Sequence, residues 1–134
     1  MVGKIAFPWL ISALLASGQT APDKAVGTLQ VSGGLEATLF AAEPECVNPT
    51  TMDIDHLGRV WICEAINYRQ KLRNQPPIRK EGDRVVILTD TNGDGRAETA
   101  STFYQGPELM SPLGIAVAKA AKGPGWTVYL CQSP

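Results

Sequence analysis

The pattern of hydrophobic and polar positions along the chain predicts short β-strands. From residue 35 onward, short apolar runs alternate with polar positions, and turns rich in glycine and proline separate them. Helical periodicity over about 10 to 15 residues is missing, so the pattern is typical of an all-β protein. We expect strands at 35–41, 50–55, 59–65, 84–90, 99–106, 113–119 and 126–132.

The segments between these strands predict hairpins. Gly58 provides a tight turn between 50–55 and 59–65, and the segment 120–125 ("AAKGPG") joins the last two strands. The four strands between Pro49 and Pro112 therefore form one antiparallel four-stranded sheet.

A weak internal repeat indicates how such sheets are arranged. Residues 48–65 resemble residues 111–133, and Pro49 and Pro112 are offset by 112 − 49 = 63 residues. The pattern predicts a partial β-propeller of about one and a half four-stranded antiparallel blades, the first at about 49–106 and the second beginning at 112–134. Chance similarity between two hydrophobic hairpins is the alternative. Since propellers close with about four to eight blades, we expect an N-terminal fragment whose partners are the missing C-terminal blades.

The N-terminus has the features of a signal peptide. One lysine precedes an apolar run at 5–16, and small residues follow, so we expect residues 1–18 to be cleaved after Gly18. A membrane anchor is the alternative, but the run is shorter than the roughly 20 residues of a membrane-spanning helix. A polar leader (19–33) follows. We expect a periplasmic, secreted or cell-surface protein with no transmembrane span after cleavage.

Composition and charge exclude some partners. The chain has 134 residues, 44% of them hydrophobic, and a net charge of -1, which suits one globular domain and provides no field that attracts nucleic acid. The basic run 68–80 has no aromatic platform interleaved with its charges, so we expect no nucleic-acid binding. It is typical of a solvated loop, and binding of an anionic polysaccharide or phosphate is the alternative.

Three cysteines leave the disulfide pairing open. Cys63 and Cys131 occupy strand positions where a free thiol packs as a small hydrophobic group, and a Cys46–Cys63 bridge is the alternative.

The segment "LTDTNGDGRAE" (88–98) has the spacing of a calcium-binding loop. Oxygen-bearing side chains occupy alternate positions, and Gly95 stands where such a loop bends sharply. Ser101 replaces the bidentate glutamate of an EF-hand, and the flanks are strands, so we expect a weak structural Ca²⁺ site. A plain Asn-Gly or Asp-Gly turn is the alternative. The expected metal ligands are Asp90, Asn92, Asp94, Arg96 through its carbonyl, and Glu98.

Polar residues after the second strand of the first blade are the candidates for catalysis. Glu64 and Asn67 stand there, although Glu64 can instead pair with Arg69 or Arg84 at the strand end. His56 is the only histidine, and its place in a turn is typical of a solvated residue.

The ordered motifs "NPTxxDxDxxGRVWxxE", "NYR", "EGDR" and "DTxGDGxAE" carry a family resemblance. From Gly34 to about Ser133 the chain resembles the N-terminal region of the PVC-type membrane-bound dehydrogenases. The resemblance implies a large secreted β-propeller protein, often with a cytochrome c module that carries haem. These proteins are similar to the sorbosone and soluble glucose dehydrogenases, which use pyrroloquinoline quinone (PQQ).

The resemblance therefore implies a quinoprotein-type dehydrogenase of sugars or aldehydes, in which a histidine acts as general base. The chain departs from that pattern at Leu109 and Met110, where such enzymes often carry an amide that contacts the quinone. We expect this chain alone to be inactive. A non-catalytic, calcium-stabilised propeller that binds partners or acts as a scaffold is the alternative.

Overall fold

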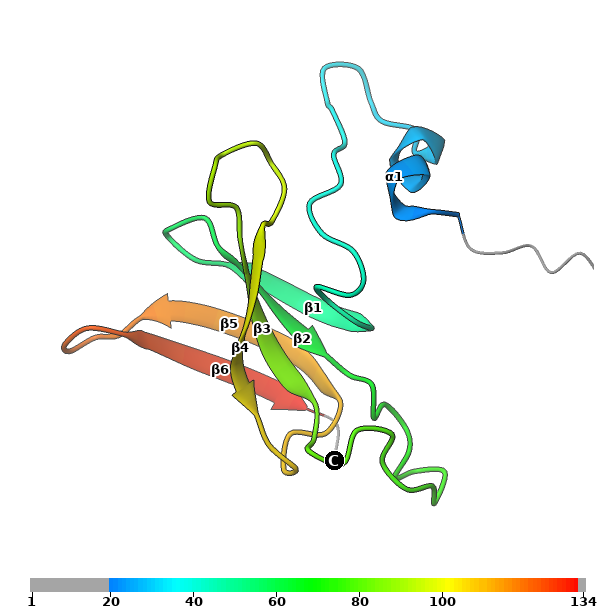
Figure 1. Cartoon of the computed structure of the whole chain (residues 1–134). Coiled ribbons are helices and arrows are strands. Elements are labelled where there is room, and N and C mark those ends of the chain that lie inside the picture. Colours follow the sequence, from blue (N-terminus) through cyan, green and yellow to red (C-terminus); the bar gives the residue numbers. More distant parts are fainter. Residues whose placement is uncertain (1–19, 133–134) are drawn as a thin grey trace, which may run out of the picture.

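The structure, a computed structural model that describes residues 20–132, contains two antiparallel sheets (Figure 1). One sheet has four strands in the order β1-β2-β3-β4, and the other pairs β5 with β6. The all-β prediction is confirmed. The elements are α1 (Pro22–Ala25), η1 (Val26–Thr28), β1 (Pro49–Ile54), β2 (Val60–Glu64), β3 (Arg84–Thr89), β4 (Thr99–Gln105), β5 (Pro112–Lys119) and β6 (Trp126–Gln132).

Two stretches before β1 differ from the prediction. The segment 35–41 is irregular instead of a strand. In place of a ladder it has a turn bond from the Leu35 N–H to the Ser32 carbonyl and an isolated bond from the Ala97 N–H to the Phe40 carbonyl. The leader contains the short helices α1 and η1, and α1 begins with a proline and Asp23 in its first turn, both of which favour a helix start. The expected signal peptide (1–18) lies outside the described residues.

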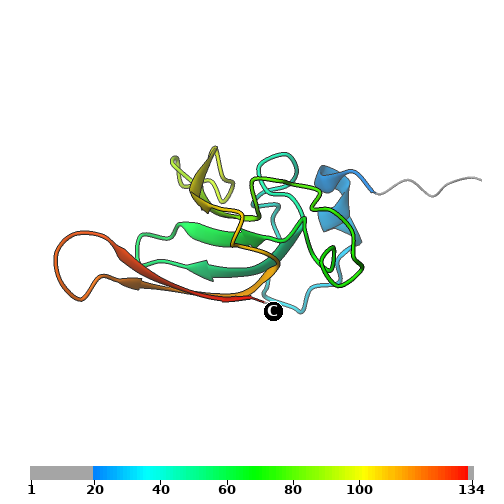
Figure 2. The same ribbon diagram turned by 90° about the horizontal axis from the view of Figure 1, so that it is seen from below.

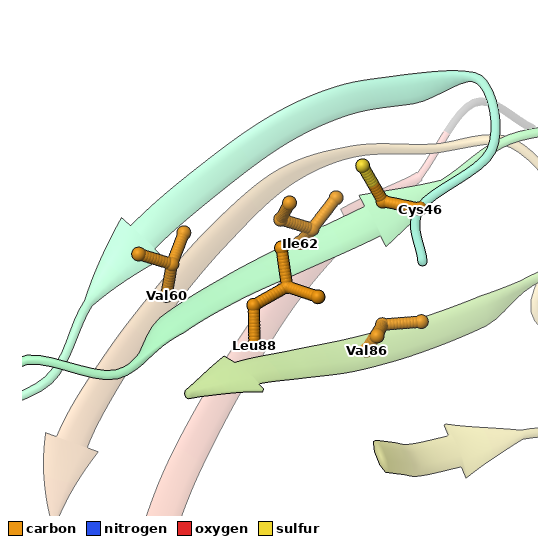
Figure 3. Close-up of a cluster of buried hydrophobic side chains, with 5 residues drawn as sticks. All are labelled: Cys46, Val60, Ile62, Val86 and Leu88. Atoms are coloured by element: carbon orange, nitrogen blue, oxygen red, sulfur yellow. The ribbon is translucent and has the colours of Figure 1, made fainter. Parts of the chain in front are cut away.

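The two sheets pack face to face, and Figure 2 shows β5 and β6 as a separate layer beside the larger sheet. Successive side chains of a strand point to opposite sides, so β2 contributes to two clusters. One contains Trp61, Cys63, Val85 and Leu109 and packs against Ile115, Val117, Trp126 and Val128 of the second sheet. The cluster on the other side, shown in Figure 3, contains Cys46, Val60, Ile62, Val86 and Leu88, against which Phe40, Ala41 and Ala97 pack.

The repeat between the hairpins β1–β2 and β5–β6 extends to their backbone geometry. Asn48 and Ser111 both have positive φ (48° and 56°), an uncommon conformation for residues other than glycine. Each precedes a proline, and in both hairpins the register shifts directly after that proline. These shared irregularities favour a true repeat over chance similarity.

The side chains opposite the two prolines repeat as well. Glu64 Oε1 accepts the Val47 N–H at 2.9 Å, and Gln132 Oε1 accepts the Met110 N–H at 3.0 Å. In both hairpins the donor stands two residues before the proline. The second hairpin therefore copies the first, with an amide in place of the carboxylate.

The cysteines form no disulfide. Cys46 and Cys63 belong to clusters on opposite sides of the four-stranded sheet, which explains why the alternative bridge is absent. Burial raises the pKa of the Cys63 thiol to about 11. The prediction that Cys131 is buried was wrong, because its side chain lies on the outward face of β5–β6 and is exposed.

Gly58 and Gly82 both have positive φ, but only Gly82 is closely surrounded. Alanine substitutions at the two positions therefore separate the cost of backbone strain from the cost of steric overlap. Gly58 (φ 79°) would place a new Cβ in open space, whereas a Cβ on Gly82 (φ 91°) would overlap the Gly106 carbonyl. We expect Gly58→Ala to cost about 1–2 kcal/mol of unfolding free energy from the left-handed backbone alone. Gly82→Ala should cost clearly more, as measured by urea unfolding. Equal costs would contradict the close approach of residues 82 and 106.

Candidate functional site

Glu64 lies at the end of β2 as a fully buried carboxylate. Arg84 donates from Nε at 2.6 Å and from Nη2 at 2.9 Å, and Arg79 donates from Nη1 at 2.9 Å. Together with the Val47 N–H, these groups occupy both carboxylate oxygens. The alternative in which Glu64 pairs with Arg84 is confirmed, Arg69 takes no part, and the sequence reasoning missed Arg79.

The charge state of Glu64 follows from this environment. Burial by itself raises its pKa, but hydrogen bonds from Arg84, Val47 and Arg79 outweigh burial, and the pKa lies below its ordinary value. Glu64 is therefore an ionised, fully paired group. A general base needs a free lone pair directed at a substrate, and Glu64 offers none.

Asn67 is also engaged within the fold. Its Nδ2 donates to the Arg79 carbonyl at 2.9 Å, and its Oδ1 accepts the Arg79 N–H at 3.0 Å, so the side chain binds both backbone polar groups of Arg79. Its backbone N–H donates to Asp83 Oδ1 at 3.0 Å. Glu64 and Asn67 thus meet at Arg79 and hold the loop between β2 and β3.

Asp83 is a structural residue that the sequence reasoning missed. It is fully buried and joins two loops, because it binds Asn67 through Oδ1 and the Ser111 N–H through Oδ2 at 2.7 Å. Its own N–H donates to the Leu109 carbonyl at 2.8 Å. The motif "EGDR" contained the signal, since an acid directly before a buried strand needs a partner.

A second missed carboxylate organises the β1–β2 turn. Asp55 accepts hydrogen bonds from the backbone of Leu57 and Arg59, and from the Trp61 indole at 2.8 Å. Burial raises its pKa, but the bonds from Trp61 and Arg59 outweigh burial and lower the pKa overall. His56 is exposed, as predicted, and its ring lies 4.8 Å from that of Trp126.

The acidic loop between β3 and β4 is folded around Asp90. Its Oδ1 accepts the Gly93 N–H at 2.6 Å and its Oδ2 accepts the Gly95 N–H at 2.8 Å. The Gly95 bond is the largest of the effects that hold the pKa of Asp90 below its ordinary value. Both glycines have positive φ, which lets the backbone curl around the carboxylate.

Three of the five predicted metal ligands lie together at this loop. Carboxylate oxygens of Asp90, Asp94 and Glu98 all lie within 4.8 Å of one another. Asn92 Nδ2 donates to both Asp94 (3.2 Å) and Glu98 (3.0 Å). The Arg96 N–H donates to Asp94 Oδ1. Such clustered oxygens can bind a hard cation.

A cleft of about 490 Å³ opens beside Asn67, at the sheet end opposite the acidic loop. Its lining mixes polar, basic and apolar side chains. Within the described part of the chain, Arg69 and Lys71 form no ion pair, and the Arg69 guanidinium lies 5.0 Å from the Tyr68 ring centroid. The lining residues are Asn67, Tyr68, Arg69, Lys71, Leu72, Pro107, Glu108, Met110, Leu113 and Gln132.

We predict that Glu64→Gln destabilises the fold by about 3 kcal/mol at pH 7. This is the low end for breaking a buried ion pair, because Arg79 and Arg84 keep 18% and 25% of their side chains exposed.

The same substitution should alter acid lability. Because the folded pKa of Glu64 is depressed, its contribution is complete above the ordinary value of 4.5 and is lost as pH falls below it. Urea unfolding from pH 7 to pH 3 should therefore show a smaller loss in Glu64→Gln than in the wild type. The exposed control Glu81→Gln should lose as much unfolding free energy between pH 7 and pH 3 as the wild type does. An equally large loss in Glu64→Gln would contradict the ion pairing of Glu64 with the two arginines.

Comparisons with known proteins identify a family. Within residues 20–132, no helix combines the length and apolar character needed to cross a membrane. No curated protein and no solved structure matches the chain. A family model described as a domain of unknown function, DUF7133, matches residues 21–122. Since the match covers most of the chain, this protein belongs to the DUF7133 family.

Proposed function

We propose that the chain is a structural segment of a secreted β-propeller, comprising its first blade and the inner half of the second. The observation that carries this proposal is the repeat of the β1–β2 hairpin in β5–β6. Each hairpin begins with a residue of positive φ, then a proline, and then a register shift. In this role the chain builds and holds a scaffold. The engagement of Glu64 and Asn67 within the fold supports a structural role over a catalytic one.

The contact between the two sheets supports the same proposal. The free edge of β5 lies against β1, where Asp53 Oδ2 accepts the Val117 N–H at 2.7 Å and Thr50 Oγ1 donates to the Pro112 carbonyl at 2.6 Å. The first strands of both sheets are thus neighbours. Blades arranged around a central channel bring their first strands together in this way.

We further propose that the acidic loop binds Ca²⁺ weakly and stiffens the β3–β4 connection. Side-chain oxygens of Asp90, Asp94 and Glu98 would provide ligands, Asn92 could add its amide oxygen after rotation, and Arg96 could add its carbonyl. These five fall short of the 6–8 oxygens that Ca²⁺ takes, so water must complete the shell. The residues fit calcium as a structural ion.

Calcium should stabilise the protein measurably. For a dissociation constant of about 0.1–1 mM, 10 mM Ca²⁺ should add about 1–3 kcal/mol to the unfolding free energy. Asp94→Asn should lose most of that gain because a ligand charge is removed, whereas Glu81→Gln, outside the loop, should keep it. Thermal unfolding and calorimetric titration measure both effects. The absence of heat and of any shift at millimolar Ca²⁺ would remove the site.

A quinoprotein-type dehydrogenase of sugars or aldehydes is a second candidate for the whole protein. The motif resemblance favours it, and the cleft beside Asn67 is a place where a small polar substrate could bind. The described residues do not fit a quinone at the position that the resemblance indicates. Leu109 is buried against the Trp61 cluster, and the Met110 N–H is used by Gln132.

The 134-residue chain alone should therefore show no turnover. We expect no dye reduction with sugars, alcohols or aldehydes, with or without added PQQ, and with or without Ca²⁺ at about 10 mM, which fills a site of the affinity assumed above. A quinone-dependent rate that Glu64→Gln abolishes would contradict the structural role assigned to this chain.

A further inference from the structure

The repeat relates the apolar faces of the two sheets residue by residue. In the first hairpin Met52 pairs with Ile62 and Ile54 with Val60, and in the second Ile115 pairs with Leu130 and Val117 with Val128. Counted from the two prolines, these pairs occupy the same positions. They therefore define one equivalent face on each sheet.

The two equivalent faces differ in what covers them. On β5–β6 the face with Val117 and Val128 packs against the Trp61 side of the four-stranded sheet. On the four-stranded sheet, the corresponding face (the β1 face: Met52, Ile54, Val60, Ile62) has no second sheet within the described residues. The segment around Phe40 buries its β2 side chains, Val60 and Ile62, and leaves those of β1 open. Met52 is 64% exposed and Ile54 is 58% exposed.

The β1 face also carries a groove beside those side chains. It has a volume of about 370 Å³, and the segment around Phe40 covers the sheet over β2 and β3 but not over Met52 and Ile54 of β1. No charged side chain lines it. The groove lining is Phe40, Ala41, Cys46, Pro49, Thr50, Thr51, Met52, Val60, Ile62 and Leu88.

A surface that resembles the Trp61 side of the four-stranded sheet lies on β5–β6, on the side turned away from that sheet. Tyr129, paired with Ala116, stands where Trp61 stands in the first hairpin, paired with Asp53, and Cys131 stands where Cys63 does. These residues form the outward face of β5–β6 (the β6 face: Gly114, Ala116, Tyr129, Cys131). Tyr129 is 65% exposed, and β6 carries no charged residue.

We propose that, in the 134-residue chain on its own, the β1 face of one molecule binds the β6 face of a second copy. The second copy then takes the place that neighbouring blades have in the proposed propeller, and repeats between molecules the sheet-to-sheet contact found within one. The proposal rests on the proposed repeat of the two hairpins and is independent of calcium binding. Each copy presents both faces, so the contact is head-to-tail and can continue into a ring or a filament. Contiguous exposed apolar patches mark protein–protein contact surfaces, and the groove joins Met52 to the apolar side chains beside it.

The direction of this contact makes it testable by complementation. Met52→Lys places a charge on the β1 face and leaves the β6 face intact, and Tyr129→Lys does the reverse. Both side chains are already exposed, so the fold should survive, as circular dichroism and the urea midpoint would verify. The matched control is Leu57→Lys, which is 64% exposed in the native chain and lies outside both faces.

Analytical ultracentrifugation of the whole chain at about 10–300 µM reads out the result. We expect the wild type and Leu57→Lys to associate, and each face variant alone to associate at least about tenfold more weakly. An equimolar mixture of the two variants should form heterodimers and stop there, because the remaining two faces are both defective.

Other outcomes would overturn the proposal. A wild type that stays monomeric throughout the range removes the contact. Association that survives Met52→Lys alone points instead to pairing of β6 with β6 between copies, and association that survives Tyr129→Lys alone points to a symmetric contact of the β1 face with itself. A mixture of the two variants that stays monomeric removes the complementary contact. Calcium titration of the same samples separates a failure here from a failure of the metal site.

Discussion

The buried ion pair between Glu64 and Arg84 is the interaction on which the larger sheet depends. It joins the end of β2 to the start of β3, and the same carboxylate also holds Arg79 in the loop and Val47 before β1. A carboxylate removed from water is costly unless its oxygens are satisfied. Three separate segments must therefore be in place before Glu64 can be buried, so they are expected to fold together.

The second hairpin shows which part of this arrangement needs charge. Gln132 accepts the Met110 N–H as Glu64 accepts that of Val47, but it requires no arginine, and its amide donates to the Glu108 carbonyl at 3.2 Å. The entry into each hairpin is set by a positive-φ residue followed by proline. A carboxylate at this position can in addition pair with an arginine of the next strand. Glu64 does so with Arg84 at the start of β3.

Alternation and turn residues predicted six of the seven expected strands and the order of the four-stranded sheet, because both signals are local. The partners of polar side chains were harder to predict. The side chains of Asp83 and Arg79 bind groups 15 to 28 residues away, and no local pattern identifies such distant partners. Cys131 failed for a related reason: alternation assigns a side chain to a face but does not say whether a second layer covers that face.

The position of the acidic loop limits what a bound metal could do. The loop lies beyond the end of β3, whereas the cleft beside Asn67 lies at the start of that strand, so the two are separated by the length of the sheet. The loop does bond directly to the segment before β1, since the Ala97 N–H donates to the Phe40 carbonyl at 2.9 Å. Ala97 and Phe40 both pack against the cluster of Val86 and Leu88. An ordered loop therefore stabilises the cover of the core, and its influence is on the scaffold and not on chemistry in the cleft.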